Sequence, residues 1–388
     1  MSKESKAVQL HRNLNGKYEI KPRAEVTEET LPLLYTPGVA EACLLIKDKP
    51  EEVHNLTRKS NTVAVITDGT AILGLGDIGP EAGLPVMEGK AILFKAFGDV
   101  DAIPILLDTK DTDEIVATIK NIAPTFGGIN LEDIAAPRCF EIERRLKEEL
   151  DIPIFHDDQH GTAIITSAAV LNILRLTKKT KDTFKIVING AGAAGIAIAK
   201  LLLEIGFIDI ILCDRLGILH PSKKPNKAKL EIGKLTNPRG IEGLLNDAIK
   251  GADLFIGVSA GNVLTEEMVR SMNFKSAVLA MANPIPEIHP DLAKKAGVYI
   301  VGTGRSDFPN QINNLSVFPG IFRAALDTNS KEINNEMMVA ASEALANVIS
   351  DAELRPNYII PSAFNLEAHN KLIEAVKKAA LESGAARI

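Results

Sequence analysis

The chain has 388 residues and a formal net charge of −6; 46% of its residues are hydrophobic and 24% are charged. This length and composition predict a globular protein with two domains, and the acidic balance argues against nucleic acid or an anionic membrane surface as a partner. Because no apolar run reaches about 18 residues, the start is charged and the three cysteines are widely separated, we expect a cytoplasmic protein with no membrane span, disulfide framework or zinc motif.

The first part of the chain is predicted to be an α/β domain over residues 1–160. After a helical N-terminal segment, two β-rich runs at 62–67 and 71–75 flank Asp68-Gly69, which predicts a β-hairpin. Helices and strands are then expected to alternate, with helices at 87–97, 113–122 and 138–150 and strands at 102–107, 127–133 and 152–155.

The second part, residues 161–388, is predicted to be a doubly wound nucleotide domain of the Rossmann type with C-terminal helices. A long apolar helix at 161–176 is expected to connect the domains, and 217–235 is expected to be a long, polar, mobile loop. Apolar strands that alternate with helices indicate a parallel sheet covered on both faces. These strands are expected at 185–189, 208–213, 254–258, 277–282 and 299–301. Two tail helices, at 332–347 and 366–381, are expected to pack back across both domains.

A glycine-rich fingerprint opens the second domain. Its six residues lie between a predicted strand and an apolar helix, and they are Gly190, Ala191, Gly192, Ala193, Ala194 and Gly195. An acidic residue, Asp214, follows Gly195 by 19 residues at the end of the next predicted strand. This arrangement predicts a dinucleotide site whose pyrophosphate lies at the helix N-terminus. The alternative is a tight turn that binds nothing.

The residues that follow three of the predicted strands bear on the cofactor. Asp214 would accept a hydrogen bond from a ribose hydroxyl and so favours NAD, whereas Arg215 could pair with the 2′-phosphate of NADP. Ser259 and Asn283 follow two further strands, at the carboxyl edge where such sheets bind ligands. We therefore expect both residues to contact the cofactor.

Two acidic pairs follow short predicted strands: Glu132-Asp133 and Asp157-Asp158. Carboxylate oxygens suit a hard cation such as Mg²⁺ or Mn²⁺, and the apolar strand before the second pair favours such a site over a solvated helix cap. His156 and His160 flank the second pair, and in an oxygen-rich site we expect them to form structural hydrogen bonds rather than to bind the metal.

Lys90 and Tyr35 are the candidate base and acid. Lys90 lies at the start of a predicted apolar helix, where burial is expected to lower its pKa toward that of a working base. The alternative is a surface lysine. Tyr35 lies in a turn with Pro37 and Gly38 and could donate a proton from it; its alternative role is packing.

Taken together, these segments resemble the malic enzymes, in particular the small prokaryotic form. The matching segments occur in order along the chain at 35–39, 68–77, 85–90, 130–133, 156–162, 190–195, 282–284 and 304–314. The resemblance implies oxidative decarboxylation of malate to pyruvate and CO₂ with NAD or NADP and with Mg²⁺ or Mn²⁺. It also implies that the protein could decarboxylate oxaloacetate.

The resemblance further implies a role for each site residue. Glu132, Asp133 and Asp158 would hold the metal, and Asp157 would orient Lys90. Lys90 would contact malate and take its C2 hydroxyl proton, and Tyr35 would protonate C3 of the enolpyruvate. Asn283 and Asn314 would hold malate carboxylate oxygens. A homodimer or higher homo-oligomer is implied, in which Tyr35 could act in a neighbour's site.

One position departs from the larger eukaryotic relatives. They carry an arginine that grips a malate carboxylate where this chain has Ala71, so that contact would come from another group. Two other hypotheses remain: a metal-independent amino-acid or folate dehydrogenase of similar two-domain plan, and a nucleotide sensor that has lost catalysis. A divalent-metal requirement would argue against the first, and pyruvate formation from malate against the second.

Overall fold

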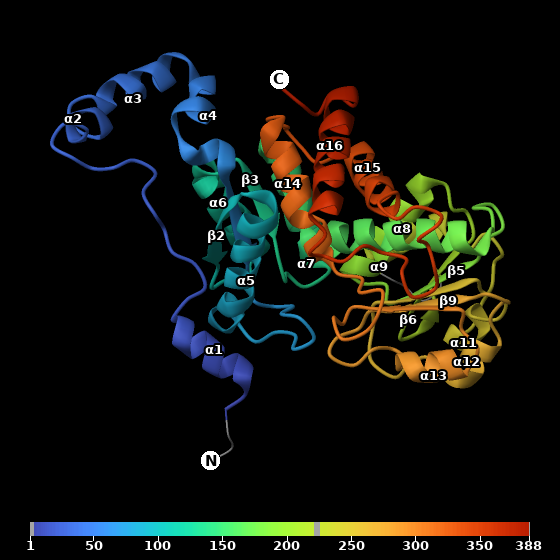
Figure 1. Cartoon of the computed structure of the whole chain (residues 1–388). Helices are drawn as coiled ribbons and strands as arrows, with labels where there is room; N and C mark the ends of the chain where they lie inside the picture. The colour runs from blue at the N-terminus through green and yellow to red at the C-terminus, as the bar shows by residue number, and fades with distance from the viewer. Residues whose placement is uncertain (1–3, 221–225, 388) are drawn as a thin grey trace.

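The structure is a computed structural model that describes residues 4–220 and 226–387 and contains two mainly parallel sheets (Figure 1). The first sheet has the order β2-β1-β3-β4, and all of its neighbouring strands are parallel. Its strands are β1 (Thr62–Thr67), β2 (Asp101–Leu106), β3 (Gly128–Leu131) and β4 (Ile154–His156). Its helices are α5 (Pro80–Gly98), α6 (Thr112–Ile122) and α7 (Arg138–Glu149), with the 3-10 turns η2 (Arg58–Asn61) and η3 (Ala123–Thr125).

The predicted hairpin around Asp68-Gly69 is wrong. Strand β1 pairs with β2 on one edge and β3 on the other, so neither edge is free for a following antiparallel strand. Residues 71–75 instead form a bend that an isolated bridge between Ile72 and Gly76 closes. The Asp68 carboxylate is buried and accepts hydrogen bonds from the backbone and hydroxyl of Thr70, which turns the chain away from the sheet.

The second sheet has the order β10-β9-β8-β5-β6-β7, and only β7 is antiparallel to its neighbour. Its strands are β5 (Ile186–Asn189), β6 (Ile210–Asp214), β7 (Gly217–Ile218), β8 (Leu254–Gly257), β9 (Ala277–Ala280) and β10 (Ile300–Thr303). The helices around it are α8 (Asp157–Thr177), α9 (Ala193–Ile205), α10 (Lys227–Leu235), α11 (Leu245–Ala248), α12 (Glu266–Arg270) and α13 (Pro290–Lys295).

The loop predicted over 217–235 is also only partly correct. Residues 217–218 form β7, and 227–235 form α10; the rest of that prediction falls in part on residues 221–225, which lie outside the described residues. Helix α10 forms because Asn226 caps its first turn by accepting from the Lys229 backbone, and Ile232 is buried in the core. The polar composition of this segment therefore led to the prediction of a loop where the chain forms a short amphipathic helix.

The C-terminal helices join the two halves of the molecule (Figure 1). They are α14 (Phe318–Asp327), which the sequence analysis did not predict, α15 (Asn335–Ala346) and α16 (Leu366–Glu382); the 3-10 turn η5 (Asn314–Ser316) precedes them. As expected, they pack back across the chain: α14 and α16 contact α5, whereas α15 contacts α8 and α9. The ring of Phe94 on α5 lies 4.7 Å from that of Phe318 and 5.4 Å from that of Phe322, centroid to centroid.

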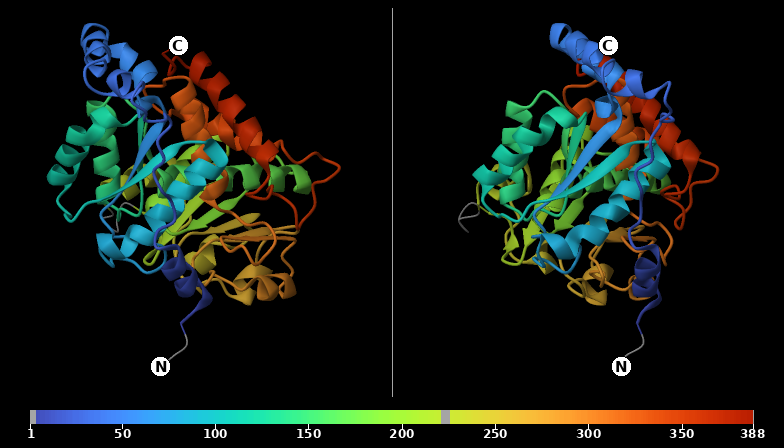
Figure 2. Two further views of the ribbon diagram at one scale, coloured as in Figure 1. Left: turned by 60° about the vertical axis from the view of Figure 1, so that its left-hand side comes forward. Right: turned by 90° about the vertical axis from the view of Figure 1, so that its left-hand side faces the viewer.

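The N-terminal segment extends away from both sheets (Figures 1 and 2). It contains α1 (Lys6–Leu14), α2 (Leu31–Leu34), α3 (Val39–Asp48), η1 (Pro50–Glu52) and α4 (Val53–Leu56), and none of these helices has a buried residue. Large apolar side chains that this segment exposes include Leu10, Ile20, Val26, Leu33 and Leu44. Among the residues described, no helix is long and apolar enough to span a bilayer.

Candidate active site

A buried lysine lies where the first sheet meets α8 and α14. Lys90 is in the middle of α5 rather than at its start, and it is only 8% exposed. Its Nζ donates to Oδ2 of the fully buried Asp157, lies 3.1 Å from Oε1 of Glu132 and sits 4.0 Å from the centroid of the Phe318 ring. The structure therefore rules out a surface lysine.

The expected direction of the Lys90 pKa is wrong for this arrangement. Burial by itself would lower that pKa, but the carboxylates of Asp157 and Glu132 outweigh burial and raise it above its ordinary value. The helix position and the burial of Lys90 can be predicted from the neighbouring sequence. The two carboxylates belong to residues far along the chain, one directly after β3 and one at the start of α8.

Helix α8 begins at Asp157, four residues before the predicted start, so Asp157 and Asp158 lie in its first turn. The partial positive charge of a helix N-terminus favours carboxylates there. Gly161 lies one turn later, where a Cβ atom would come within 1.8 Å of Asp157 Oδ1 and 3.1 Å of Asn314 Cβ. The glycine thus leaves room for the Asp157 carboxylate, and the fold brings Asn314 beside it.

Three carboxylates form a cluster next to Lys90. Glu132, Asp133 and Asp158 each offer an oxygen, and these oxygens lie within 4.8 Å of one another. The backbone bends sharply at Asp133, whose φ is 52°, and its N–H donates to Asp158 Oδ2 over 2.8 Å. That bend lets consecutive residues reach one point, as the cluster requires. These are the same three residues that the resemblance to the malic enzymes implies as metal ligands.

The electrostatics of this cluster favour a cation. Burial and then the neighbouring Asp158 carboxylate raise the pKa of Asp133 to about 8, and burial also raises the pKa of Glu132 well above its ordinary value. Oδ2 of Asp133 is buried and has no hydrogen-bond partner among the described residues. Crowded carboxylate oxygens of this kind fit a hard divalent cation, which would satisfy the orphaned oxygen and offset the repulsion.

The two histidines near the cluster lie outside the group of carboxylate ligands. His160 Nε2 is 2.7 Å from Oε1 of Glu143 on α7, and the same carboxylate accepts from Gln159 Nε2. His156 is fully buried, and its Nδ1 lies 3.8 Å from Asp158 Oδ2; neither ring nitrogen has a hydrogen-bond partner among the described residues, so the hydrogen-bonding role predicted for His156 is wrong. Glu143, which the sequence analysis missed, therefore fixes the first turn of α8 from behind.

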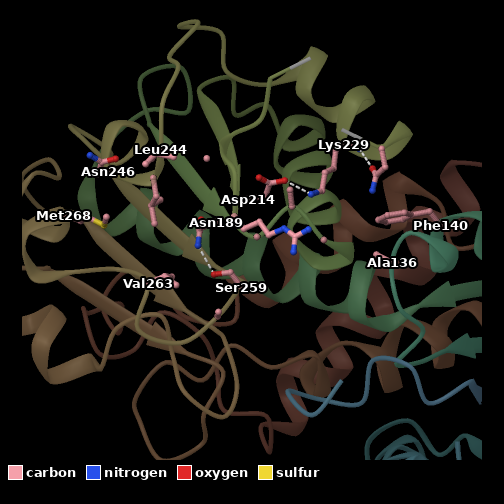
Figure 3. Close-up of a pocket in the computed structure, with 18 residues that line it drawn as sticks. Ala136, Phe140, Asn189, Asp214, Lys229, Leu244, Asn246, Ser259, Val263 and Met268 are labelled. Atoms are coloured by element: carbon pink, nitrogen blue, oxygen red, sulfur yellow. Dashed lines mark hydrogen bonds and ion pairs between the residues drawn. The ribbon is translucent and has the colours of Figure 1, made fainter. Parts of the chain in front are cut away.

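A cavity of about 870 Å³ opens at the carboxyl edge of the second sheet (Figure 3). The predicted cofactor residues that line it are Gly190, Ala191, Gly192, Asp214, Arg215 and Ser259, whereas Ala193, Ala194, Gly195 and Asn283 do not. Ala136 and Phe140, just after the acidic loop of the first half, also line the cavity.

The fingerprint glycines fulfil the spatial requirements expected of them. Gly190 has φ +117°, and a Cβ there would lie 2.3 Å from the Val258 carbonyl oxygen. A Cβ on Gly195 would lie 1.8 Å from the Gly190 carbonyl oxygen. The turn can therefore close tightly between β5 and α9, whose first turn contains Ala193 and Ala194.

Asp214 has a cationic neighbour that the sequence analysis missed. Nζ of Lys229, on α10, lies 2.5 Å from Asp214 Oδ2, and both side chains line the cavity with Arg215 (Figure 3). Lys229 was overlooked because it falls within residues 217–235, which were predicted to form a loop. It follows Asp214 by 15 residues in the chain.

Asn283 and Tyr35 are not brought to the acidic cluster by the described contacts. Asn283 lies on the exposed loop after β9, where a Cβ on Gly74 would be 2.1 Å from its carbonyl oxygen and a Cβ on Gly304 would be 2.9 Å from its Nδ2. Tyr35 is 67% exposed and lies between α2 and α3 in the N-terminal segment, and Figure 1 shows these two helices apart from β3 and α8.

Comparison with known proteins identifies relatives over nearly the whole chain. Residues 13–147 match the family model "Malic enzyme, N-terminal domain", and residues 159–381 match "Malic enzyme, NAD binding domain". A bifunctional malic/malolactic enzyme of Bacillus subtilis is 54% identical over 100% of this chain and 95% of its own length. An NAD-dependent malic enzyme of Geobacillus stearothermophilus is 55% identical over 97% of this chain and 79% of its own length. The crystal structure of an NAD-dependent malic enzyme from Thermotoga maritima superposes with a TM-score of 0.93 at 49% identity, covering 96% of this chain and 99% of that one.

Proposed function

The chain belongs to the malic enzyme family, and we propose that Lys90 and the adjoining carboxylate cluster form its catalytic centre. The protein oxidatively decarboxylates malate to pyruvate and CO₂ and reduces NAD or NADP. The observation that carries the assignment of the centre is the position of the Lys90 amine between Asp157 and the cluster of Glu132, Asp133 and Asp158.

Glu132, Asp133 and Asp158 are the proposed ligands of Mg²⁺ or Mn²⁺. Their mutual distance, their burial and the unpartnered oxygen of Asp133 support this assignment. A bound divalent cation supplies Lewis-acid stabilisation of negative charge on the oxygen at C2 of the substrate.

Lys90 is the proposed base for the C2 hydroxyl proton. The amine must be neutral to accept it, and the surrounding carboxylates hold it protonated when their charge is uncompensated. A cation held by the cluster would offset that charge and lower the pKa of Lys90 toward a working range. Asp157 accepts a hydrogen bond from Nζ and thereby fixes where the amine points, while the Phe318 ring shields it from water.

The cavity beside the second sheet is the proposed cofactor site. The turn from Gly190 to Gly195 would hold the pyrophosphate, and a nicotinamide held in the cavity would supply the acceptor for the C2 hydride. Asp214 would bind the adenosine ribose, with Arg215 beside it, and Ser259 and Asn283 would approach the cofactor from the next strands. Because Lys229 pairs with Asp214, the site can offset the charge that would otherwise repel the 2′-phosphate of NADP.

Three further residues, Asn314, Asn283 and Tyr35, have proposed roles in binding malate and in protonating the product. Asn314, which packs against Gly161, and Asn283 would hold malate carboxylate oxygens. Tyr35 would protonate C3 of the enolpyruvate in the site of a second subunit, since its segment lies away from the cluster of its own chain and exposes apolar side chains. We therefore propose at least a homodimer.

Within each chain, the boundary between the metal domain and the nucleotide domain is placed at residues 160–161, just inside α8.

The decisive assay combines malate, Mn²⁺ and either NAD or NADP, and measures pyruvate together with the reduced cofactor. Equal amounts of pyruvate and NAD(P)H are expected, and a chelator is expected to abolish both. Turnover that persists without a divalent cation would instead favour the metal-independent dehydrogenase. The formation of lactate and the consumption of oxaloacetate are measured in parallel, because one relative is named a malic/malolactic enzyme.

A further inference from the structure

A further buried carboxylate, that of Glu287, lies behind the residues that line the cofactor cavity. Glu287 is 0% exposed and follows β9 in a loop. Its Oε1 accepts from the backbone N–H of Ser259 over 2.8 Å and from the Ser259 hydroxyl over 3.2 Å. Its Oε2 accepts from the backbone N–H of Ala282 over 3.1 Å. One carboxylate thus joins the segment after β8 to the segment after β9.

The first of these segments belongs to the cofactor cavity. Ser259 lines the cavity, and its hydroxyl accepts from Nδ2 of Asn189 over 2.8 Å, a contact drawn in Figure 3. Asn189 ends β5 and directly precedes Gly190, the first glycine of the fingerprint. Any ligand that orders the fingerprint turn and Ser259 therefore also orders the carboxylate behind them.

The second segment reaches the other half of the molecule. Ala282 precedes Asn283, whose carbonyl oxygen is so close to Gly74 that no side chain fits at that position. The bend that contains Gly74 is held in turn by the hydrogen bond from the Ala71 N–H to the Asp133 carbonyl oxygen, which measures 2.9 Å. The segment after β9 therefore contacts a bend that is itself hydrogen-bonded to the loop bearing the proposed metal ligand Asp133.

The chain makes room for this carboxylate at a cost. A Cβ on Gly257, the last residue of β8, would lie 2.3 Å from Cδ of Glu287 and 2.6 Å from each carboxylate oxygen. Within the described residues, the hydrogen bonds that Glu287 accepts come from N–H groups and a hydroxyl rather than from a cation. Burying a carboxylate without an ion pair is expensive, and packing alone would be served better by an apolar residue.

We propose that Glu287 is a positioning residue that couples cofactor binding to substrate binding. The inference rests on the proposed function, in which the Ser259 segment faces the cofactor and the Asn283 segment faces malate. When one ligand orders its segment, the shared carboxylate orders the other segment as well, so the second ligand binds at a smaller entropic cost. By linkage, the effect on affinity is the same in both directions.

Glutamine at this position breaks the connection at nearly constant volume. An amide has a single acceptor oxygen and presents an NH₂ group in place of the other oxygen. In Glu287→Gln, either Ser259 or Ala282 must therefore lose its acceptor. Glu287→Asp retains the charge but shortens the side chain by one methylene, so it cannot span the same two segments.

The experiment measures the dissociation constant of NADH by its fluorescence, with and without Mn²⁺ and oxalate, a dicarboxylate that chelates metal but cannot be turned over. In the wild-type enzyme we expect Mn²⁺ and oxalate together to tighten NADH binding about fivefold or more. In Glu287→Gln we expect this factor to fall below about twofold, while NADH alone binds within about threefold of the wild type. The exposed Glu267→Gln, which removes the same charge from α12, is expected to keep the wild-type factor.

A purely structural role would lower the melting temperature of Glu287→Gln and leave the coupling factor intact, and that outcome overturns the proposal. So does a wild-type enzyme that shows no coupling. If Glu287→Gln fails to fold, the factor by which Mn²⁺ and oxalate tighten NADH binding is measured in Glu287→Asp instead, and it is judged by the same limits. A wild-type protein that forms no pyruvate from malate would instead contradict the proposed function. The NADH-binding measurement requires no turnover, so the two outcomes can be told apart.

Discussion

The buried ion pair between Lys90 and Asp157 joins two helices, α5 and α8, whose residues here are 67 positions apart in the chain. Asp157 also begins the helix that leads from the acidic cluster to the second sheet. The same contact therefore holds the proposed base and connects the half that would bind metal to the half that would bind the cofactor.

Replacing the lysine separates catalysis from cofactor binding. Lys90→Ala removes the proposed proton acceptor, so we expect kcat for malate oxidation to fall by about 10²–10⁴-fold. NADH binding, measured by fluorescence, should be unchanged because Lys90 does not line the cofactor cavity. Some loss of stability is expected, since Asp157 is left buried without its cation, typically about 3–5 kcal/mol.

Lys120→Ala, on the exposed face of α6, serves as the control for the loss of a lysine and should retain full activity. If NADH binding were lost in Lys90→Ala while the variant remained folded, the role assigned to Lys90 would be wrong.

Removing one proposed ligand should weaken metal binding specifically. Asp158→Asn keeps the size of the side chain but loses its charge, and we expect the Mn²⁺ dissociation constant to rise by about 100-fold or more, since even groups that only support ligands cost 10–100-fold. Electron paramagnetic resonance of free Mn²⁺ measures this directly. Asp151→Asn, at an exposed aspartate before β4, should bind Mn²⁺ like the wild type. A normal Mn²⁺ titration for Asp158→Asn would remove this residue from the ligand set.

The Lys229–Asp214 pair should influence the choice between NAD and NADP. Lys229→Ala removes a cation from the cavity and leaves the Asp214 charge less compensated, so kcat/KM with NADP should fall by about 10–100-fold, as for a lost hydrogen bond to a charged group. The value with NAD should change far less. Lys234→Ala lies on the same helix and is exposed, which makes it the matched control. An equal loss with both cofactors would show that Lys229 does not discriminate between them.

How far the sequence could predict this molecule depends on whether a feature is local. All strands of the second sheet except β7 were predicted to within a few residues, because each is a short buried apolar run between polar turns, as at Leu254 to Gly257. The two acidic pairs could be found locally because each follows a short apolar strand, but the choice of Glu132, Asp133 and Asp158 among the four came from the resemblance to malic enzymes; the structure brings oxygens of these three within 4.8 Å of one another. The hairpin failed because the second edge of β1 is taken by β3, a strand distant in sequence.

The features that were missed depend on contacts between distant segments. The pKa of Lys90 moves opposite to the expectation because two carboxylates reach it from β3 and α8. The helix α14 was not predicted, yet it places Phe318 over the Lys90 amine. Lys229 was hidden in a segment whose polar composition suggested a loop. Periodicity along one segment contains no information about such partners.

The stability of the first sheet should depend on pH through Asp101. Burial opposes ionisation of this carboxyl, but hydrogen bonds from Arg58, Lys95 and Asn61 outweigh burial and lower its pKa below 3.8. The folded state therefore binds its proton less readily than the unfolded chain, so the stabilisation is present above pH 3.8 and is lost as the pH falls through the lower, folded value.

Asp101→Asn should accordingly reduce the free energy of unfolding in urea at pH 7 by roughly 1 kcal/mol or less, the usual range for a partly exposed pair. The difference from the wild type should shrink at the acid end of a pH series. Asp182→Asn, at an exposed aspartate, should match the wild type throughout. A difference that stays constant down to the lowest pH at which the protein folds would exclude an ionic origin.

The position of Tyr35 can be tested by mixing two inactive proteins. Tyr35→Phe lacks the proposed acid and Lys90→Ala lacks the proposed base, so each alone should be inactive in pyruvate formation. If Tyr35 serves the partner's site in a two-fold symmetric dimer, a mixed dimer contains one site with both groups intact. Random mixing after subunit exchange should then restore roughly a quarter of the wild-type sites. Should both residues act within one chain, the mixture would remain inactive, and the exposed N-terminal segment would need another explanation.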